Sequence, residues 1–389
     1  MPTMTAYVMP QNDSVRHQIR DVLVPLVAMF LASRLVLLVL ASMTLQLSGA
    51  HGANSSLAPM LCRWDCEWYL GIAQHGYSTY EPGLAYGHAP GETTFGFYPL
   101  YPLIVRFFTP LMGGDVLHAG ILVSNLCFLA ALFYVYLYVR ELGLNRSVGL
   151  LTACMLCVFP QSIVFSAPLS ESIFLLLMAA AMYHFRREQY LVAGIAAALL
   201  TAVRPNGILF IVFAGVLLVQ QHGLRAVLAP WRMPEKFVPI VLAPLGMFLF
   251  LTYCYVATGD AFAHESTESI GWGWAFVPPW ENLLEQLHSG SVLALCAAIS
   301  ISVALCSLLL LQYGMYAEFA FCIASILLIW CGQGVVSLFR YWMILFPIWI
   351  AVARSVAVRP MGATLLCALL GMISGVIACA WALGSIIAL

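Results

Sequence analysis

The stretch VLVPLVAMFLASRLVLLVLASMTLQL, from Val22 to Leu47, is apolar almost throughout and carries a single charge, at Arg34. A helix needs about 20 such residues to cross the hydrocarbon layer of a membrane. The strands of a membrane barrel would instead alternate in polarity with a period of two. The stretch is too long for the core of a cleavable signal peptide, and it follows a polar segment holding Arg16 and Arg20. It therefore predicts a retained first membrane-spanning helix.

The rest of the chain has the same apolar character. Of its 389 residues, 62% are hydrophobic and 8% are charged, whereas soluble domains carry about 25% charged residues. We expect an all-α polytopic membrane protein in which residues 1–389 form a single integral membrane domain. The net charge of −1 argues against a nucleic-acid partner. About eleven spans are predicted, at residues 22–47, 116–139, 148–166, 170–185, 190–203, 207–221, 237–257, 291–312, 316–334, 341–356 and 361–388.

The basic residues set the expected topology. With residues 1–21 on the cytoplasmic side, most of the Lys and Arg residues between the spans fall on that side too, as the positive-inside rule requires. Two long segments, residues 48–115 and 258–290, then form the first and second outer loops. The second contains five acidic residues, several tryptophans and no Lys or Arg. That composition is typical of a loop folded back onto the membrane interface, where Trp is enriched.

A few arginines break this charge rule. Arg63, Arg106, Arg204 and Arg340 fall on or near the outer side, and Arg34 lies within the first span. A misplaced charge is costly, so each marks either a functional site or an ion-paired or snorkelling structural residue. We expect a structural role for Arg34 and functional roles for Arg204 and Arg340.

The segment RWDCEWYLGIAQHGY, from Arg63 to Tyr77, follows the first span and combines acids, an arginine and aromatics. If residues 64–73 are helical, Trp64 and Trp68 share one face while Asp65 and Tyr69 share the next. A carboxylate so placed suits general-base work on a hydroxyl. The alternative is an interfacial helix whose Asp65 merely pairs with Arg63.

Two further readings of this segment concern metals and disulfides. Asp65 and Glu67 form a D-x-E, whose oxygens could hold a divalent cation. Residues two apart on a helix point in different directions, so no metal site is expected. Cys62 and Cys66 are the pair most suited to face outward, and a disulfide between them is possible, whereas most other cysteines lie inside apolar runs as small hydrophobes.

Three more segments interrupt the apolar pattern. Residues 95–103 hold Pro99 and Pro102, which predict either a kinked re-entrant entry or a proline-started helix. Ser170 and Glu171 open a span, where they either cap a helix or face a cavity. Arg204 follows residues 201–203, and Arg340 stands among aromatics in residues 337–342. The planar fork of arginine is well suited to phosphate oxygens.

Taken in this order, these segments resemble the GPI mannosyltransferase 2 (class V, PIG-V-like) family of membrane glycosyltransferases and its bacterial relatives. The W-D-x-x-W-Y segment is the specific part of the resemblance. The matching residues are Arg63-Trp64-Asp65, Trp68-Tyr69, Ile72-Ala73, Gly76-Tyr77, Tyr98-Pro99-Leu100-Tyr101-Pro102, Ser170-Glu171, Phe174, Arg204, Asn206-Gly207, Arg340-Tyr341 and Phe346-Pro347.

The resemblance implies a GT-C fold and an inverting transfer of a hexose, typically mannose, from a polyprenyl-phosphate donor. Asp65 matches the essential acid of the first outer loop and would be the general base. Arg204 and Arg340, then Arg63, would bind the donor phosphate. No metal and no cofactor is expected, and no glycine-rich nucleotide loop is visible. The expected substrate-binding residues are Trp64, Glu67, Trp68, Tyr69, His75, Tyr98, Tyr101, Glu171, Asn206 and Tyr341.

The expected partners are membrane lipids, the lipid-linked donor, and a glycolipid or other hydroxyl acceptor. The chain is short beside eukaryotic members and shows no ER retrieval signal, so a bacterial inner membrane with the site facing the periplasm is expected. In a eukaryote the site would face the ER lumen. Two alternatives remain open: a transporter or flippase of lipid-linked sugars, and a non-catalytic subunit of a glycosylation complex.

Overall fold

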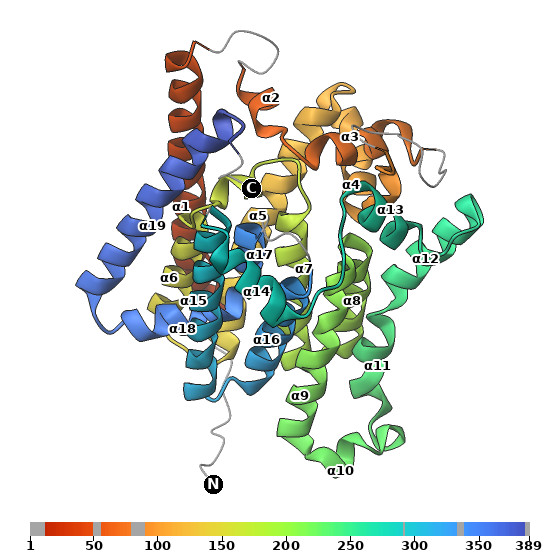
Figure 1. Cartoon of the computed structure of the whole chain (residues 1–389). Helices are drawn as coiled ribbons and strands as arrows, with labels where there is room; N and C mark the ends of the chain where they lie inside the picture. The colour runs from red at the N-terminus through yellow and green to blue at the C-terminus, as the bar shows by residue number, and fades with distance from the viewer. Residues whose placement is uncertain (1–11, 50–55, 79–89, 291, 333–337, 386–389) are drawn as a thin grey trace.

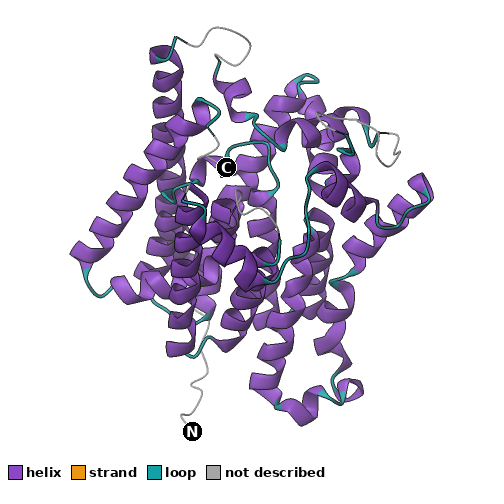
Figure 2. Ribbon diagram, in the orientation of Figure 1, coloured by secondary structure: helices purple, strands orange, loops and turns teal. Residues whose placement is uncertain are grey.

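The computed structural model describes residues 12–49, 56–78, 90–290, 292–332 and 338–385, and in this part the chain is a bundle of helices (Figures 1 and 2). One isolated bridge, between Phe276 and Gly332, is the exception within these residues. The helices are α1 Asn12–Leu47, α2 Leu57–Leu61, α3 Cys66–His75, α4 Leu100–Phe108, α5 Val116–Glu141, α6 Arg146–Cys157, α7 Glu171–Arg186, α8 Tyr190–Val203, α9 Phe210–His222, α10 Leu224–Val227, α11 Pro234–Leu242, α12 Leu245–Thr258, α13 Ala263–Gly271, α14 Pro279–His288, α15 Val292–Gln312, α16 Tyr316–Trp330, α17 Leu338–Ile344, α18 Phe346–Val356 and α19 Pro360–Ala382.

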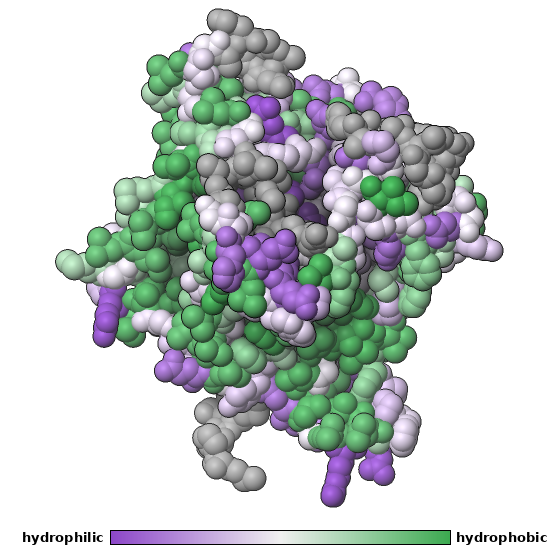
Figure 3. Space-filling model, viewed as in Figure 1, coloured by the Kyte–Doolittle hydropathy of each residue, from purple (hydrophilic) through white to green (hydrophobic). Residues whose placement is uncertain are grey.

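Six stretches of the described chain are long and apolar enough to cross a membrane, which confirms an integral membrane protein of the all-α class. They are Asp21–Leu47, Val116–Glu141, Pro205–His222, Pro234–Thr258, Leu293–Gln312 and Pro360–Ala382. Five shorter apolar segments accompany them, so the total of eleven spans stays a prediction. Apolar side chains cover the flank formed by α1 and α19 in Figure 3, as expected of a surface facing lipid.

Several predicted spans are not single helices. The span 148–166 ends as α6 at Cys157 and resumes as a short 3-10 turn at Ser162–Phe165, with Pro160 between them. The span 237–257 divides at Pro244 into α11 and α12. The span 341–356 divides into α17 and α18, whose second residue is Pro347. Proline lacks the N–H that a continuing helix needs, so each break falls near one.

Arg34 satisfies the backbone at one of these breaks. Its Nη1 donates to the Ser162 carbonyl oxygen at 2.6 Å, and its Nη2 donates to the Cys157 carbonyl oxygen at 3.1 Å. The guanidinium also lies over the Phe128 ring, 5.1 Å from its centroid. The end of α6 would otherwise leave these carbonyls without partners in an apolar environment. Arg34 therefore has the structural role expected of it.

The two ends of α7 each carry a buried ion pair. Glu171 begins α7 at the end of the bundle where α2, α3 and α13 lie, the upper end in Figure 1, which we call the site end. Arg186 ends α7 and pairs with Glu318 of α16, which is fully buried. Arg186 Nε also donates to the Tyr138 hydroxyl at 2.9 Å. At 1.5 Å per residue the ends of α7 are about 22 Å apart, so the two pairs are independent.

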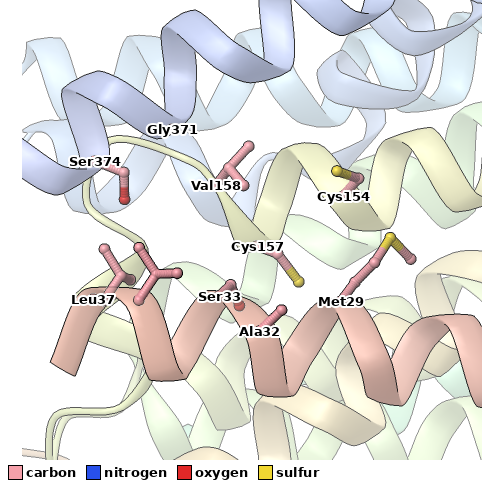
Figure 4. Close-up of a pocket in the computed structure, with 10 residues that line it drawn as sticks. Met29, Ala32, Ser33, Leu37, Cys154, Cys157, Val158, Gly371 and Ser374 are labelled. Atoms are coloured by element: carbon pink, nitrogen blue, oxygen red, sulfur yellow. The ribbon is translucent and has the colours of Figure 1, made fainter. Parts of the chain in front are cut away.

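A cavity of about 270 Å³ lies between α1, α6 and α19 (Figure 4). Its lining is almost entirely apolar and includes Met29, Leu37, Cys154, Val158 and Gly371. None of the arginines, acids or aromatics that the sequence singles out for chemistry belongs to this lining. The cavity is therefore separate from the candidate site.

Candidate active site

The turn that carries Asp65 differs from the expected helix over residues 64–73. Helix α3 begins at Cys66, two residues late, because Trp64 adopts a left-handed backbone conformation with φ of 52°. Asp65 stands at the N-cap position, yet its side chain does not bond the helix N-terminus. Trp64 and Trp68 therefore do not share a helical face, and the Asp65 carboxylate stays available for other partners.

A disulfide between Cys62 and Cys66 closes this turn, with 5.2 Å between the two Cα atoms. Trp64 packs edge-on against Trp381 of α19, with ring centroids 4.5 Å apart. Arg63 Nη2 donates to the Ala382 carbonyl oxygen at 2.9 Å. The Arg63 side chain thus connects this turn to the end of α19. The structure shows a different ion-pair partner for Asp65, so the expected alternative of an Asp65–Arg63 pair is wrong.

Four charged side chains from four separate segments meet beside this turn, and we call Asp65, Glu171, Arg204 and Arg340 the charged cluster. Arg340 Nη1 lies 2.9 Å from Asp65 Oδ2 and 3.6 Å from Glu171 Oε1. Arg204 Nη2 lies 2.6 Å from the same Glu171 oxygen. The side chain of Glu171 is fully buried, those of Arg340 and Arg204 are 6% and 12% exposed, and that of Asp65 is 30% exposed. Asp65 is therefore the member that an incoming substrate reaches most easily.

Ser170 and Tyr69 extend the charged cluster by hydrogen bonds. Arg204 Nε donates to Ser170 Oγ at 2.8 Å, and that oxygen lies 2.9 Å from the Tyr69 hydroxyl. Ser170 does not cap α7 through its side chain, so the capping alternative is wrong for it. Burial raises the pKa of Tyr69 to about 12, so its hydroxyl is neutral at physiological pH. Tyr341 lies beneath Arg204, with 5.4 Å from the guanidinium carbon to the ring centroid.

The charges in the cluster balance, with two arginines facing two carboxylates. Glu171 Oε1 is shared by both guanidinium groups, while its Oε2 has no hydrogen-bond partner among the described residues. A buried charge is tolerated only when it is paired and hydrogen-bonded. Glu171 therefore holds the two arginines side by side, where an anionic group entering near Asp65 would meet both.

Aromatic side chains border the cluster on the side of α3. Trp68 stacks on Phe97 with centroids 5.6 Å apart and meets Trp272 edge-on at 5.7 Å. Tyr69 meets Tyr101 edge-on at 5.2 Å. Trp68 is half-buried, and Trp272 is 39% exposed. The border is thus partly open to a ligand.

Other predicted binding residues lie apart from the cluster. Tyr98 belongs to a separate apolar group and packs on Phe250 at 4.5 Å. Tyr101 is fully buried and its hydroxyl lies 2.8 Å from Ser124 Oγ. Glu67 and His75 are exposed on α3. Tyr98 and Tyr101 are thus packed in the interior, with Tyr101 reaching the cluster only through Tyr69, whereas Glu67 and His75 face outward.

Two smaller expectations have mixed outcomes. Helix α4 begins directly after Pro99, with Pro102 in its first turn, as the proline-started alternative expected. Asn206 lies in the 3-10 turn Pro205–Leu209 after Arg204, and its buried Oδ1 has no hydrogen-bond partner within the described ranges. Across those same ranges, no group of three or more His, Cys, Asp or Glu side chains is placed to hold a metal ion.

Sequence reasoning assigned no role to Glu268 of α13, although its charge acts on the cluster. Burial and the negative charge of Asp65 together raise the pKa of the Glu268 carboxyl to about 7, and the positive charge of Arg204 opposes this rise. Glu268 appeared in the sequence as one of five acids in a loop without basic residues. The one signal in the sequence was its distance of four residues from Trp272, which places the two side chains on the same face if the segment is helical.

Residues 36–274, which are more than half of the chain, match the model of the family described as mannosyltransferase (PIG-V). The chain belongs to this mannosyltransferase (PIG-V) family. The match includes Asp65, Glu171, Arg204 and Glu268, so most of the site lies within the family's characteristic region. Arg340 lies beyond the match, and its ion pairs with Asp65 and Glu171 bring it to the site.

Curated relatives agree with this assignment. The chain is 31% identical over 217 residues to the GPI alpha-1,6-mannosyltransferase 2 of Mus musculus and 28% identical to that of Homo sapiens, and both matches cover 50% of this chain. The GPI mannosyltransferase 2 of Cryptococcus neoformans is 28% identical over 160 residues. The matched parts represent 36–40% of these relatives, so the chain spans well under two thirds of their length.

Solved structures show the fold. The oligosaccharyltransferase of Archaeoglobus fulgidus, tethered to an acceptor peptide, aligns with a TM-score of 0.52 at 13% identity and covers 93% of this chain and 55% of that one. Its complex with an inhibitory peptide and a dolichol-phosphate aligns with a TM-score of 0.50. The fold of this PIG-V family member is therefore the GT-C fold, as the resemblance implied.

Proposed function

We propose that this chain transfers mannose from a polyprenyl-phosphate donor to a hydroxyl group of a glycolipid acceptor, with inversion and with Asp65 as the general base. The family supports a mannosyl transfer. The observation that carries the mechanism is the geometry around Asp65, whose carboxylate is the most exposed part of a cluster that also contains two arginines.

The proposed reaction is a single displacement. Asp65 takes the proton of the acceptor hydroxyl as the hydroxyl oxygen attacks the anomeric carbon of the donor sugar. The bond between that carbon and the phosphate oxygen breaks, and its electron pair leaves with the polyprenyl phosphate. Because attack and departure occur on opposite faces of the sugar, the configuration inverts.

Arg204 and Arg340 would stabilise the charge that grows on the leaving phosphate. Their shared partner Glu171 holds both guanidinium groups in place before the donor arrives, so little reorganisation accompanies the reaction. We do not assign this role to Arg63, because its guanidinium donates a hydrogen bond to the carbonyl oxygen of Ala382 at the end of α19. No metal ion is needed to balance the leaving charge, and we propose a metal-independent reaction.

The location of the site follows from the same proposal. The charged cluster lies at the site end of the bundle, beside the segments of the two expected outer loops. We propose that this end faces away from the cytoplasm, towards the periplasm in a bacterial inner membrane. The donor and the acceptor are both lipids, so both would then reach Asp65 by diffusing along the outer leaflet of the membrane.

The proposal is tested with purified protein, polyprenyl-phosphate-mannose and synthetic glycolipids ending in glucosamine or mannose. Asp65→Asn removes the base without changing size, and we expect transfer to fall about 10²–10⁴-fold. Glu67→Gln is the matched control, because Glu67 is an exposed acid two residues away. Activity of the wild type should survive EDTA.

The outcomes separate the alternative functions. An Asp65→Asn variant as fast as the wild type would refute the proposed mechanism. Movement of intact lipid-linked sugar across liposomes without transfer would identify a flippase instead. Absence of both activities in protein that binds neither lipid would support a non-catalytic subunit.

A further inference from the structure

The second outer segment places two side chains at the site end, the carboxyl group of Glu268 and the indole of Trp272. The proposed reaction uses neither of them. Helix α13 carries Glu268, and Trp272 follows four residues later with its backbone N–H bonded to the Glu268 carbonyl oxygen at 3.3 Å. Residues four apart on a helical turn lie on one face. Trp272 reaches Trp68 of α3, so the face that carries Glu268 is directed towards the start of α3 and therefore towards Asp65.

Close packing fixes the rotation of α13. The hydroxyl groups of Thr267 and Thr93 lie 2.7 Å apart, and both residues are buried. A Cβ added at Gly96 would lie 2.7 Å from the Trp272 ring and 3.2 Å from the Thr267 methyl group, so the backbone at Gly96 sits directly against this helix. These contacts therefore fix the direction in which the side chain of Glu268 leaves the helix.

We propose that Glu268, Trp272 and Trp68 form a subsite that binds a pyranose ring next to Asp65, a role that rests on the proposed glycosyl transfer. Aromatic rings supply flat apolar surface for the C–H face of a sugar, and a carboxyl group pairs with its hydroxyls. Trp272 is 39% exposed, and the side chains of Glu268 and Trp68 are half-buried, so the three side chains are in part accessible from outside. The ring is either the mannose of the donor or the terminal sugar of the acceptor.

Burial, and then the charges around Glu268, favour the neutral form of its carboxyl group. Asp65 from the turn before α3 and Glu265 of α13 repel a second negative charge, and Arg204 after α8 attracts one. The 3-10 turn Thr94–Gly96 adds no charged side chain, and Asp260 before α13 acts on Glu265. Arrival of the anionic donor adds repulsion, so Glu268 binds as a carboxylic acid that donates a hydrogen bond to a sugar oxygen.

This protonation state gives the subsite a pH dependence. The pKa of Glu268 is raised to about 7, so the neutral form is present below that pH and is lost above it. The KM for the ligand held by Glu268 should therefore rise as the pH increases from 6 to 8. Glu268→Gln keeps a neutral hydrogen-bonding group and should show no such rise.

The test compares Glu268→Ala, Glu268→Gln and the control Glu285→Ala, which removes an exposed acid of α14 in the same outer segment. The KM for polyprenyl-phosphate-mannose and the KM for a mannose-ended glycolipid are measured separately at pH 6.5 and 8. Loss of one hydrogen bond to a sugar hydroxyl should raise one KM about tenfold in Glu268→Ala, with kcat changed little. Whichever KM rises identifies the source of the ring. Glu268→Gln and Glu285→Ala should match the wild type at pH 6.5.

Binding to Asp65→Asn protein, followed by tryptophan fluorescence, separates this inference from the proposed function. If no transfer occurs but Glu268→Ala weakens binding of either lipid in that background, the subsite stands without the reaction. If transfer occurs and the three variants equal the wild type in both KM values, the subsite is refuted alone. If neither lipid binds the protein, both proposals fall. Equal losses in Glu268→Ala and Glu268→Gln, or a fall in kcat alone, would also refute a sugar-binding role.

Discussion

Arg204 illustrates how much of the site depends on single atoms. Its Nη2 pairs with Glu171 Oε1, while its Nε donates to Ser170 Oγ. A lysine carries the same charge on one flexible ammonium group and lacks the planar fork whose two nitrogens make these contacts in parallel. The position thus requires arginine for its shape as well as its charge.

We therefore expect Arg204→Lys to lower kcat/KM about 10- to 100-fold, because each lost charged hydrogen bond is worth about 1.5–3 kcal/mol. The midpoint of thermal unfolding should change little, since the charge opposite Glu171 is kept. Steady-state transfer assays and thermal unfolding in detergent would measure both. Arg187→Lys is the control, because Arg187 is exposed and lies 3.7 Å from Glu141. An active Arg204→Lys variant would show that charge alone suffices.

At this scale the sequence singled out each member of the charged cluster but did not predict their ion pairs, and the roles assigned to them stay predictions. A charged side chain in an apolar chain is costly and is therefore conspicuous in the sequence. This is why the sequence drew attention to Asp65, Glu171, Arg204 and Arg340. Tyr98 and Tyr101 were expected to bind substrate but are packed in the interior. An aromatic residue is equally suited to a core and to a ligand, so only the fold distinguishes the two.

The turn between α2 and α3 is the element on which the base depends. Trp64 in this turn has a left-handed backbone conformation. Bulky residues adopt this conformation rarely, at a cost of about 1–3 kcal/mol. The Cys62–Cys66 disulfide joins the two ends of the turn around Trp64 and Asp65. The crosslink therefore helps to keep Asp65 facing Arg340.

Reduction of this disulfide should slow transfer several-fold with little change in KM. The reason is that Asp65 would leave its position more often, while Arg204, Arg340 and Glu268 lie on elements that the disulfide does not join. A Cys62→Ser/Cys66→Ser variant measures the effect, and a reducing agent should reproduce it in the wild type but leave the variant unchanged. The ten remaining cysteines, all in the described part of the chain, are free thiols. Equal kcat values for oxidised wild type and variant would contradict the prediction.

Element boundaries were predicted where composition changes and missed where geometry decides. The first span and residues 116–139 correspond to α1 and α5. The late start of α3 could not be read from residues 63–66, because its cause is the positive φ of Trp64 rather than a glycine or proline. The breaks in the predicted spans lie near prolines, but proline also occurs inside α1 at Pro25 without ending it. Tertiary packing decides between these outcomes.

At the scale of the whole molecule, two buried groups of ion pairs among the described residues lie at opposite ends of α7. The pair of Arg186 and Glu318 joins α7 to α16 and lies far from Asp65. The sequence did not predict that Arg186 and Glu318 form a pair, because 132 residues separate them. This pair holds the bundle together without belonging to the site.

Glu318→Ala should therefore lower the stability of the protein by about 3–5 kcal/mol, because it leaves Arg186 buried without its partner. Transfer per folded molecule should stay near that of the wild type. Replacing both partners, as Arg186→Leu/Glu318→Leu, should recover much of the loss. Thermal unfolding and transfer assays on the folded fraction would measure these effects. A stable but inactive Glu318→Ala variant would show instead that the pair communicates with the site.

The separation of Asp65 and Arg340 along the chain has a consequence for biosynthesis. The two residues lie 275 positions apart, and the ribosome releases them in that order. While α7 and α8 are already inserted, Glu171 and Arg204 can pair, but Asp65 must wait for α17. An interrupted chain would thus display an unsatisfied acid at the membrane surface, a feature by which a membrane quality-control protease could distinguish unfinished molecules from complete ones.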